Sequence, residues 1–433
     1  TMSSAVIDLA GKLRLRPGSA EPVRCERPVV AAAMMRKLTQ GRRAQLLPDL
    51  LGALFTLCSG AHRLASRRAV LAALAERGET HTSATAGASS DAHQSRLLAL
   101  LSARDHLQRL ALDLPGQWPV DGVAADPGWL RLAPVWTLAS GSELPALESQ
   151  QTAAAALPRW LEQRLLGMPP AQWLAHWHDQ PEQWLADWAA GRDHPLARWY
   201  GGVRQTAQAT HLPCRPLDVL AHGEPGLRQL ADQLAREPGF TEQPHWQGAP
   251  AETGAWTRLG NNVASDMSLW HRLGARLAEV VSLSLAAAGE QASAARPAMG
   301  ALNVAPGQAL AWCEMSRGLL FHWVQLEPGH ANRDTARVND YRVLAPTEWN
   351  FHAHGALASA LRERRLDAAQ TRMATLALDP CVAFDLVESA DTDVDEAQAP
   401  RTTSGRTIAA ASTDTPPSGA SAVVNRTEGL GHA

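Results

Sequence analysis

Helical periodicity dominates the pattern of apolar and polar residues along this chain. Apolar side chains recur every three or four residues over 31–57 and again over 62–77, with Gly41 and Pro48 as interruptions. The same spacing predicts a helix over 95–112, which ends at an Asp-Leu-Pro sequence. These segments predict a fold in which helices carry most of the core.

A second long helix is predicted further along the chain. It begins at Asp266, which serves as the N-cap, and continues to about Ala288. Residues 78–90 are small and polar, and they predict an exposed loop between two of the earlier helices.

Strands are expected only in one part of the chain. Between residues 300 and 350 the apolar residues form short runs of strand length, at 309–312 and 318–326. The predicted fold is therefore mainly α with a smaller β component, in the α+β class.

A short internal repeat, the tryptophan repeat, lies between residues 172 and 188. The sequence QWLAHW at 172–177 returns at 183–188 as QWLADW, and an offset of eleven residues returns to the same helix face after three turns. The repeated Trp residues suggest either an aromatic stripe for docking a partner or two amphipathic helices divided at Pro181. We favour the second interpretation, with the Trp pairs packed inward.

Composition and charge narrow the class of protein. The chain has 433 residues, of which 45% are apolar and 19% charged, as in ordinary globular proteins. A net charge of -3 gives no reason to expect a nucleic-acid partner. Neither a secretion signal nor an uncharged apolar run of membrane-spanning length is evident, which predicts a cytoplasmic protein without a membrane partner. The acidic and then small, polar residues of 389–433 predict a disordered tail after a single domain over 1–388.

The five cysteines are widely separated and contain no CxxC pair. This spacing argues against a disulfide framework and against a structural zinc site, which needs four closely arranged ligands. Any joint chemistry of these thiols requires residues that the fold brings together from distant segments. The cysteines are Cys25, Cys58, Cys214, Cys313 and Cys381.

Two of the cysteines lie in segments that resemble metal-binding motifs of one family. The segment LCSGAHRLAS at 57–66 resembles the RxCGxCxxxHxxAS motif of [NiFe]-hydrogenase large subunits, with Cys58 at the second cysteine and His62 at the histidine. Phe55 occupies the position of the first cysteine. The segment LDPCVAFDLV at 378–387 resembles the C-terminal DPCxxCxxH motif, with Cys381 at the first cysteine and Phe384 at the second. Each pair thus retains one cysteine.

Three further segments resemble this family in the family's order. They are GAPAETGAWTR at 248–258, similar to GxPxETGPxAR, EMSRGLLFHW at 314–323, similar to EAPRGxLxHW, and YRVLAPTEWN at 341–350, similar to YxxxxPTxWN. The resemblance implies a [NiFe]-hydrogenase large-subunit-like fold, reduced in size. A large subunit with degenerate metal motifs is similar to the HupK/HoxV group of hydrogenase maturation proteins.

The departures from the motifs matter most for function. In the family, four thiolates hold nickel, and two of them bridge to an iron that carries two cyanides and one carbon monoxide. With Phe55 and Phe384 in place of two thiols, the resemblance implies loss of the nickel site. The iron brings three strong ligands of its own, so Cys58 and Cys381 are the expected metal ligands. By analogy the counterpart of Cys58 bridges both metals, which makes it the firmer iron ligand.

Two other residues carry expectations from the resemblance. Arg317 matches an arginine beside the cyanides, and its guanidinium could donate hydrogen bonds to a cyanide nitrogen. A surface salt bridge is the alternative role for Arg317. His62 would donate or accept a hydrogen bond near the iron, and the alternative is a histidine satisfied within the core.

The resemblance implies a maturation scaffold without catalytic activity. It would receive the cyanide- and carbonyl-bearing iron transiently from upstream assembly proteins and pass it to the apo large subunit of a [NiFe] hydrogenase. Two rival functions stay open: a metal-free adaptor that mimics the large subunit, and a degenerate hydrogenase or hydrogen sensor. The roles of Cys25, Cys214 and Cys313 are left unassigned.

Overall fold

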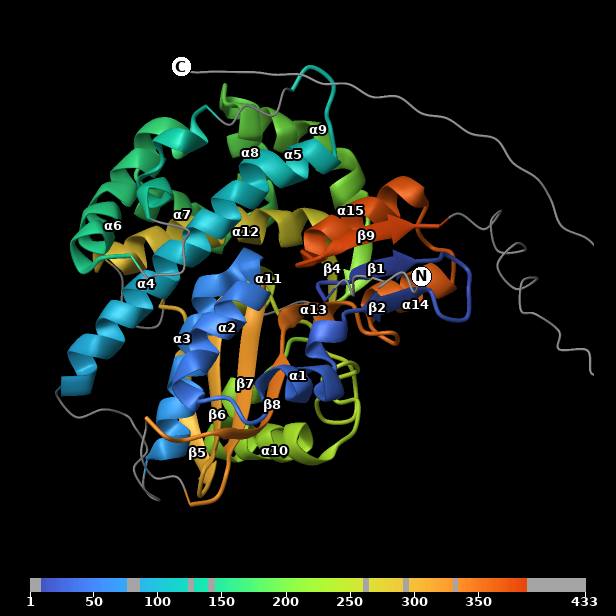
Figure 1. Ribbon diagram of the computed structural model, residues 1–433. Helices are drawn as coiled ribbons and strands as arrows, with labels where there is room; N and C mark the ends of the chain where they lie inside the picture. Colours follow the sequence, from blue (N-terminus) through green and yellow to red (C-terminus); the bar gives the residue numbers. More distant parts are fainter. Residues whose placement is uncertain are drawn as a thin grey trace, which may run out of the picture. The chain divides into compact units, whose positions relative to one another are not determined.

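Helices dominate the structure, with smaller sheets beside them (Figure 1). The fold class predicted from the sequence, mainly α with a smaller β component, is confirmed. The predicted tail lies outside the described residues, so the division into 1–388 and 389–433 stays a prediction. The computed structural model describes residues 9–75, 86–123, 128–138, 145–259, 265–290, 296–329 and 334–387.

Helix α12 (Leu269–Ala288) runs through the middle of the helical part, and nearly all its side chains are buried. The predicted N-cap, Asp266, is wrong. Residues 266–268 form strand β4, and the Ser268 hydroxyl caps the helix by accepting a hydrogen bond from the backbone N–H of His271 at 3.0 Å. The helices packed against α12 are α4 (Ala86–Gln108), α6 (Leu147–Leu161), α7 (Pro170–Asp179), α8 (Pro181–Gly191), α9 (Pro195–Ala209), α11 (Ala255–Arg258) and α15 (Ala368–Leu378).

The tryptophan repeat over 172–188 lies in α7 and α8, which are divided at Pro181 as predicted. Trp173, Trp177 and Trp188 are buried in the core around α12, and Trp184 packs against it from a partly buried position. The repeat is therefore a packing device rather than an exposed docking stripe.

A four-stranded antiparallel sheet forms the second part of the core. Helix α3 (Ser59–Leu74) lies against one face, and α10 (Gly223–Arg236) packs on the other. Alternate residues of each strand face the two helices, since successive side chains of a strand point to opposite faces. The strands, in sheet order, are β5 (Met299–Ala305), β6 (Gln308–Met315), β7 (Gly318–Leu326) and β8 (Val338–Leu344).

The predicted helix over 31–57 is divided into two shorter ones. Helix α1 (Ala32–Thr39) ends just before Gly41, whose positive φ of 72° turns the chain, and α2 (Leu47–Leu54) follows. Pro48 lies in the first turn of α2 rather than interrupting a helix, because that turn needs no backbone donor there.

Helix α4 is longer than its sequence pattern predicts. It begins at Ala86, so the end of the predicted loop over 78–90 is wrong, while residues 78–85 lie outside the described part. At its C-terminal end it continues through a π-helical turn (Arg109–Asp113) into α5 (Leu114–Gln117). The wider π turn lets the helix run on past the Asp-Leu-Pro sequence, and such turns often lie at functional sites.

A three-stranded sheet joins the two ends of the described chain. Strand β1 (Lys12–Leu15) pairs antiparallel with β2 (Val23–Glu26) and parallel with β9 (Ala383–Leu386). This pairing holds the segment after β2 close to Cys381 of the second cysteine motif, because β9 begins two residues after Cys381. The shorter elements that complete the fold are β3 (His211–Pro213), α13 (Pro346–Asn350) and α14 (Ala356–Arg362).

Candidate functional site

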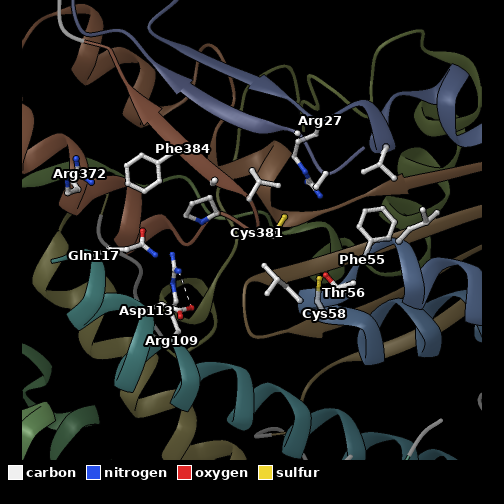
Figure 2. A pocket seen from close by; sticks show the side chains of 18 residues that line it. Arg27, Phe55, Thr56, Cys58, Arg109, Asp113, Gln117, Arg372, Cys381 and Phe384 are labelled. Atoms are coloured by element: carbon white, nitrogen blue, oxygen red, sulfur yellow. Dashed lines mark hydrogen bonds and ion pairs between the residues drawn. The ribbon is translucent and has the colours of Figure 1, made fainter. Parts of the chain in front are cut away.

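A cavity of about 640 Å³ contains both motif cysteines (Figure 2). Its walls come from the segment after β2, the α2–α3 junction, the π turn after α4, helix α15 and the residues leading into β9. The polar and aromatic residues that line it include Arg27, Phe55, Cys58, Arg109, Asp113, Gln117, Arg372, Cys381 and Phe384. The fold thus brings Cys58 and Cys381, distant in sequence, to one site.

Cys58 lies at the N-cap of α3, where the backbone turns from α2 into α3, and only 6% of its surface is exposed. Burial raises the pKa of its thiol, the nearby Cys381 raises it further, and the Arg317 guanidinium acts in the opposite direction. Without a ligand this thiol therefore stays protonated, and a bound metal would have to displace its proton.

Cys381 is more accessible than Cys58 and has a polar partner. It is half-buried, and its Sγ lies 3.0 Å from the hydroxyl of Thr347 in α13. The same hydroxyl accepts a hydrogen bond from the backbone N–H of Cys381 at 3.3 Å. Thr347 therefore holds the thiol in one orientation at the cavity wall.

The two phenylalanines in the vacated cysteine positions have different surroundings. Phe55 is buried and stacks on the ring of His62, with 3.9 Å between ring centroids and 2° between planes. Phe384 is only half-buried, and the Arg372 guanidinium lies 5.8 Å from its ring centroid. Figure 2 shows Phe55 on the Cys58 side of the cavity and Phe384 on the opposite side. Their equivalence in sequence does not extend to the structure.

His62 lies behind Phe55, and it is not among the residues that line the cavity. Its Nδ1 is 3.0 Å from Nε2 of His322, whose Nδ1 is 2.7 Å from the hydroxyl of Tyr341. Burial, followed by the proximity of His322, lowers the pKa of His62 well below its usual value, so the ring is neutral. The other nitrogen, Nε2, has no hydrogen-bond partner among the described residues.

We expect the buried His322 to make stability depend on pH. Burial lowers its pKa to about 3, whereas an unfolded histidine titrates near pH ~6.5. Between these two pKa values the unfolded chain binds a proton that the folded protein does not. The stability that this contributes is therefore fully present above the unfolded pKa, and the free energy of unfolding decreases as pH falls toward the folded pKa, by up to about 1.4 kcal/mol per pH unit. In chemical denaturation between pH ~6.5 and ~5, His322→Gln should show a correspondingly shallower slope. An unchanged slope, equal to that of the exposed-site control His178→Gln, would contradict this.

Arg317 lies in the turn between β6 and β7 and is buried, so the surface salt bridge considered above is not its environment. Its nearest counter-charge is Asp379, with 3.8 Å between Nε and Oδ1. Neither Nε nor Nη1 of Arg317 makes a hydrogen bond within the described part of the chain. A buried guanidinium with free donors is ready for an acceptor that a ligand supplies.

Two carboxylates accompany Arg317. Asp379 directly precedes the Pro380-Cys381 pair. It forms ion pairs with Arg109 and Arg276 as well as with Arg317, and the three guanidinium groups hold its pKa far below the usual range. Asp105 on α4 accepts a hydrogen bond from Ser316, and burial raises its pKa to about 6. Asp379 could have been suspected from its place in the second motif.

Arg27 lines the cavity and was not foreseen from the sequence. It follows β2, is 5% exposed, and pairs through Nη1 with the buried carboxylate of Glu348. No sequence signal identifies it, since an arginine after a short strand ordinarily lies in solvent. Arg109, in the π turn, was likewise missed.

The other three cysteines do not line the cavity. Cys25 on β2 is half-buried, with its Sγ 4.0 Å from Oε1 of Glu348. Cys313 is fully buried in the sheet and donates to the carbonyl oxygen of Ala61 at 3.6 Å. Cys214 is buried in the core around α12. Burial raises the pKa of all three thiols, as expected for cysteines that act as small apolar residues.

The donor set fits a metal that brings ligands of its own. Among the described residues, no group of three or more His, Cys, Asp or Glu side chains is placed to hold a metal ion. The cavity instead offers two thiols, apolar Phe walls and guanidinium donors. Soft thiolates suit iron. Arg317 does not line the cavity, but it is buried close to Cys58, and its unpartnered donors suit small acceptor ligands on such a metal.

Within the described ranges, no single helix is both long and apolar enough to span a membrane, although one bent pair, 44–54 with 56–74, meets the length and composition criteria when taken together.

Comparison with known proteins places the chain in a family. No protein-family profile matches it. The hydrogenase expression/formation protein HoxV of Cupriavidus necator is 38% identical over 87% of this chain and 95% of its own length. HupK of Rhizobium leguminosarum bv. viciae, with the same description, is 32% identical over 82% of this chain and 91% of its own. Among solved structures, the Ni-Fe-Se hydrogenase of D. vulgaris Hildenborough covers 80% of this chain and 90% of its own, at 14% identity and a TM-score of 0.42. On the extent and identity of the first two matches, the chain belongs to the HoxV/HupK family of hydrogenase expression/formation proteins.

Proposed function

We propose that this protein is a scaffold without catalytic activity that holds an iron carrying two cyanides and one carbon monoxide. It receives this unit from upstream assembly proteins and passes it to the apo large subunit of a [NiFe] hydrogenase. The iron unit is cargo, held only until transfer.

The observation that carries the proposal is the convergence of Cys58 and Cys381 on one cavity. Two thiols complete the coordination of an iron that already has three diatomic ligands, whereas nickel held by thiolates needs more soft ligands than the described residues provide here. Cys58 and Cys381 are the iron ligands in this proposal.

Arg317 and His62 have supporting roles. Arg317 donates to a cyanide nitrogen, which its unpartnered Nε and Nη1 favour. His62 acts from behind Phe55, because its ring is neutral and stacked on that side chain. It thus keeps the wall of the cavity in place, although His62 itself does not line the cavity.

Infrared spectroscopy tests the proposal directly. Protein purified without oxygen from a hydrogenase-producing cell should show cyanide and carbonyl stretching bands and contain iron. The double variant Cys58→Ala/Cys381→Ala should lose both the bands and the ability to support maturation.

Three outcomes would contradict the carrier function. Wild-type protein without these bands does not carry the unit. Full maturation by the double variant would favour a metal-free adaptor that mimics the large subunit. Stoichiometric nickel together with hydrogen–deuterium exchange would favour a hydrogenase or hydrogen sensor.

A further inference from the structure

Arg27 lines the cavity of Cys58 and Cys381 on the side of Cys381. Figure 2 shows its guanidinium directed at the space between Cys381 and Phe55. Arg317, which the motif singled out, is buried nearby but is not part of the cavity wall. A ligand on the two thiols therefore meets Arg27 as a wall residue.

The contacts of Arg27 leave part of its donor set unused. Nη1 is paired with Oε1 of Glu348, a carboxylate that is 1% exposed. Nε has no hydrogen-bond partner among the described residues, although the side chain is only 3% exposed. A guanidinium carries five N–H donors in a rigid fork, so one edge can stay on Glu348 while another meets a ligand.

Burying such a cation without full pairing is costly, and the fold offsets the cost only in part. Glu348 provides one carboxylate for it, and Oε2 of that carboxylate is itself unpartnered within the described chain. The arrangement holds the guanidinium at the cavity but leaves it incompletely satisfied, as expected for a group whose remaining partner arrives with the ligand.

The negative charge of the bound iron unit also favours a contact with Arg27. Two cyanides balance the charge of iron(II), so the unit bound to two thiolates keeps the negative charge of those thiolates inside a buried site. Arg317 already shares Asp379 with Arg109 and Arg276. Two lining arginines lie outside this cluster: Arg372 is beside Phe384, whereas Arg27 is beside Cys381 (Figure 2).

We propose that Arg27 binds the iron unit directly, donating a hydrogen bond to a cyanide nitrogen, and that Glu348 is the positioning residue that orients it. This inference rests on the proposed carrier function and adds a second cyanide-binding arginine to it. Cyanide, rather than carbon monoxide, is the partner because its nitrogen is the stronger acceptor and carries negative charge.

Infrared spectra of Arg27 variants test this inference. A hydrogen bond at the nitrogen of cyanide raises its stretching frequency, so Arg27→Gln should lower one cyanide band by several wavenumbers and reduce iron content several-fold. Arg27→Lys keeps the charge without the fork and should give an intermediate result. Arg24→Gln is the matched control, because Arg24 lies on β2, three residues before Arg27, with its side chain 63% exposed.

Two further variants separate folding from binding. Arg27→Gln leaves Glu348 buried without its partner, so Arg27→Gln/Glu348→Gln, which removes both charges, should fold more stably and show the same spectral change. Glu348→Gln alone should keep its iron but shift the cyanide band. A Glu348 that served only the stability of the fold would not change this band. If the Arg27→Gln protein has the same cyanide bands and iron content as the wild type, the inference about Arg27 is wrong, while the carrier function still stands. Absence of bands in the wild type would overturn the carrier function and this inference with it.

Discussion

A Cys58→Ser variant is expected to retain at most about a tenth of the wild-type iron, since loss of an outer-shell partner alone weakens metal affinity about 10–100-fold. Serine keeps the size of the side chain but offers a hard oxygen in place of a soft thiolate. Cys58 is buried at the start of α3, so no water-exposed group can readily replace it as a ligand.

Cys381→Ser should behave differently. Cys381 is the more accessible thiol and already contacts the Thr347 hydroxyl at 3.0 Å. We therefore expect it to act in receiving and releasing the cargo, and its loss to slow iron loading more than it lowers the final iron content. Iron per protein, followed over time with a loaded assembly protein as donor, measures both quantities.

Cys214→Ser is the matched control for these variants. Cys214 has the same 6% exposure as Cys58 but lies in the core around α12, away from the cavity. Its replacement should leave iron loading unchanged. Equal iron in the Cys58→Ser and Cys214→Ser proteins would refute the assignment of Cys58 as the firmer ligand.

Replacing Asp379 with Asn should produce the largest loss of stability. Asp379 is buried among Arg109, Arg276 and Arg317, and its removal leaves three guanidinium groups without their shared counter-charge. Breaking a buried ion pair in this way costs about 3–5 kcal/mol of unfolding free energy. That is a large fraction of the ~5–15 kcal/mol typical of a folded protein.

Asn is chosen because Asp379 has a left-handed backbone, with φ of 57°, which Asn tolerates better than most residues. The variant therefore isolates the effect of charge. The low pKa of Asp379 contributes stability above its unfolded value of about 3.9, and this stability is lost as pH falls through the folded pKa. The difference between wild type and variant should be constant near neutral pH and shrink in acid.

Urea denaturation at several pH values measures this difference. Asp385→Asn is the control, because Asp385 lies a few residues away in an exposed ion pair with Lys12. Exposed pairs contribute about 0–1 kcal/mol, so that variant should unfold nearly as the wild type does. An Asp379→Asn protein as stable as the control would show that the three arginines find other partners.

Part of the site was predictable because its residues belong to local motifs. Cys58 and Cys381 each stand in a short segment with characteristic spacing, and the structure places both at one cavity. The helical fold was also predictable, because the helices around α12 and the strands β6 and β7 follow simple apolar periodicities.

The sequence alone was less informative wherever long-range pairing competes with local preference. Asp266 is a good N-cap residue, yet residues 266–268 pair with β3, and Ser268 caps α12 instead. The end of α4 was missed for a similar reason, since a π turn carries the helix past its sequence stop. Local preferences differ by about 1 kcal/mol, which tertiary packing readily overrides.

By itself, then, the sequence of this protein determined the helical fold class, the resemblance to a family and the two surviving thiols, because each depends on residues close together in the chain. Only the tertiary structure decided that Phe55 covers His62 while Phe384 lies beneath Arg372, and that Arg27 faces the thiols. The place of Arg27 beside Cys381 follows from the pairing of β1 with β2 and β9, which joins residues some 370 positions apart. Burial and charge pairing arise from such contacts, so no local pattern could reveal them.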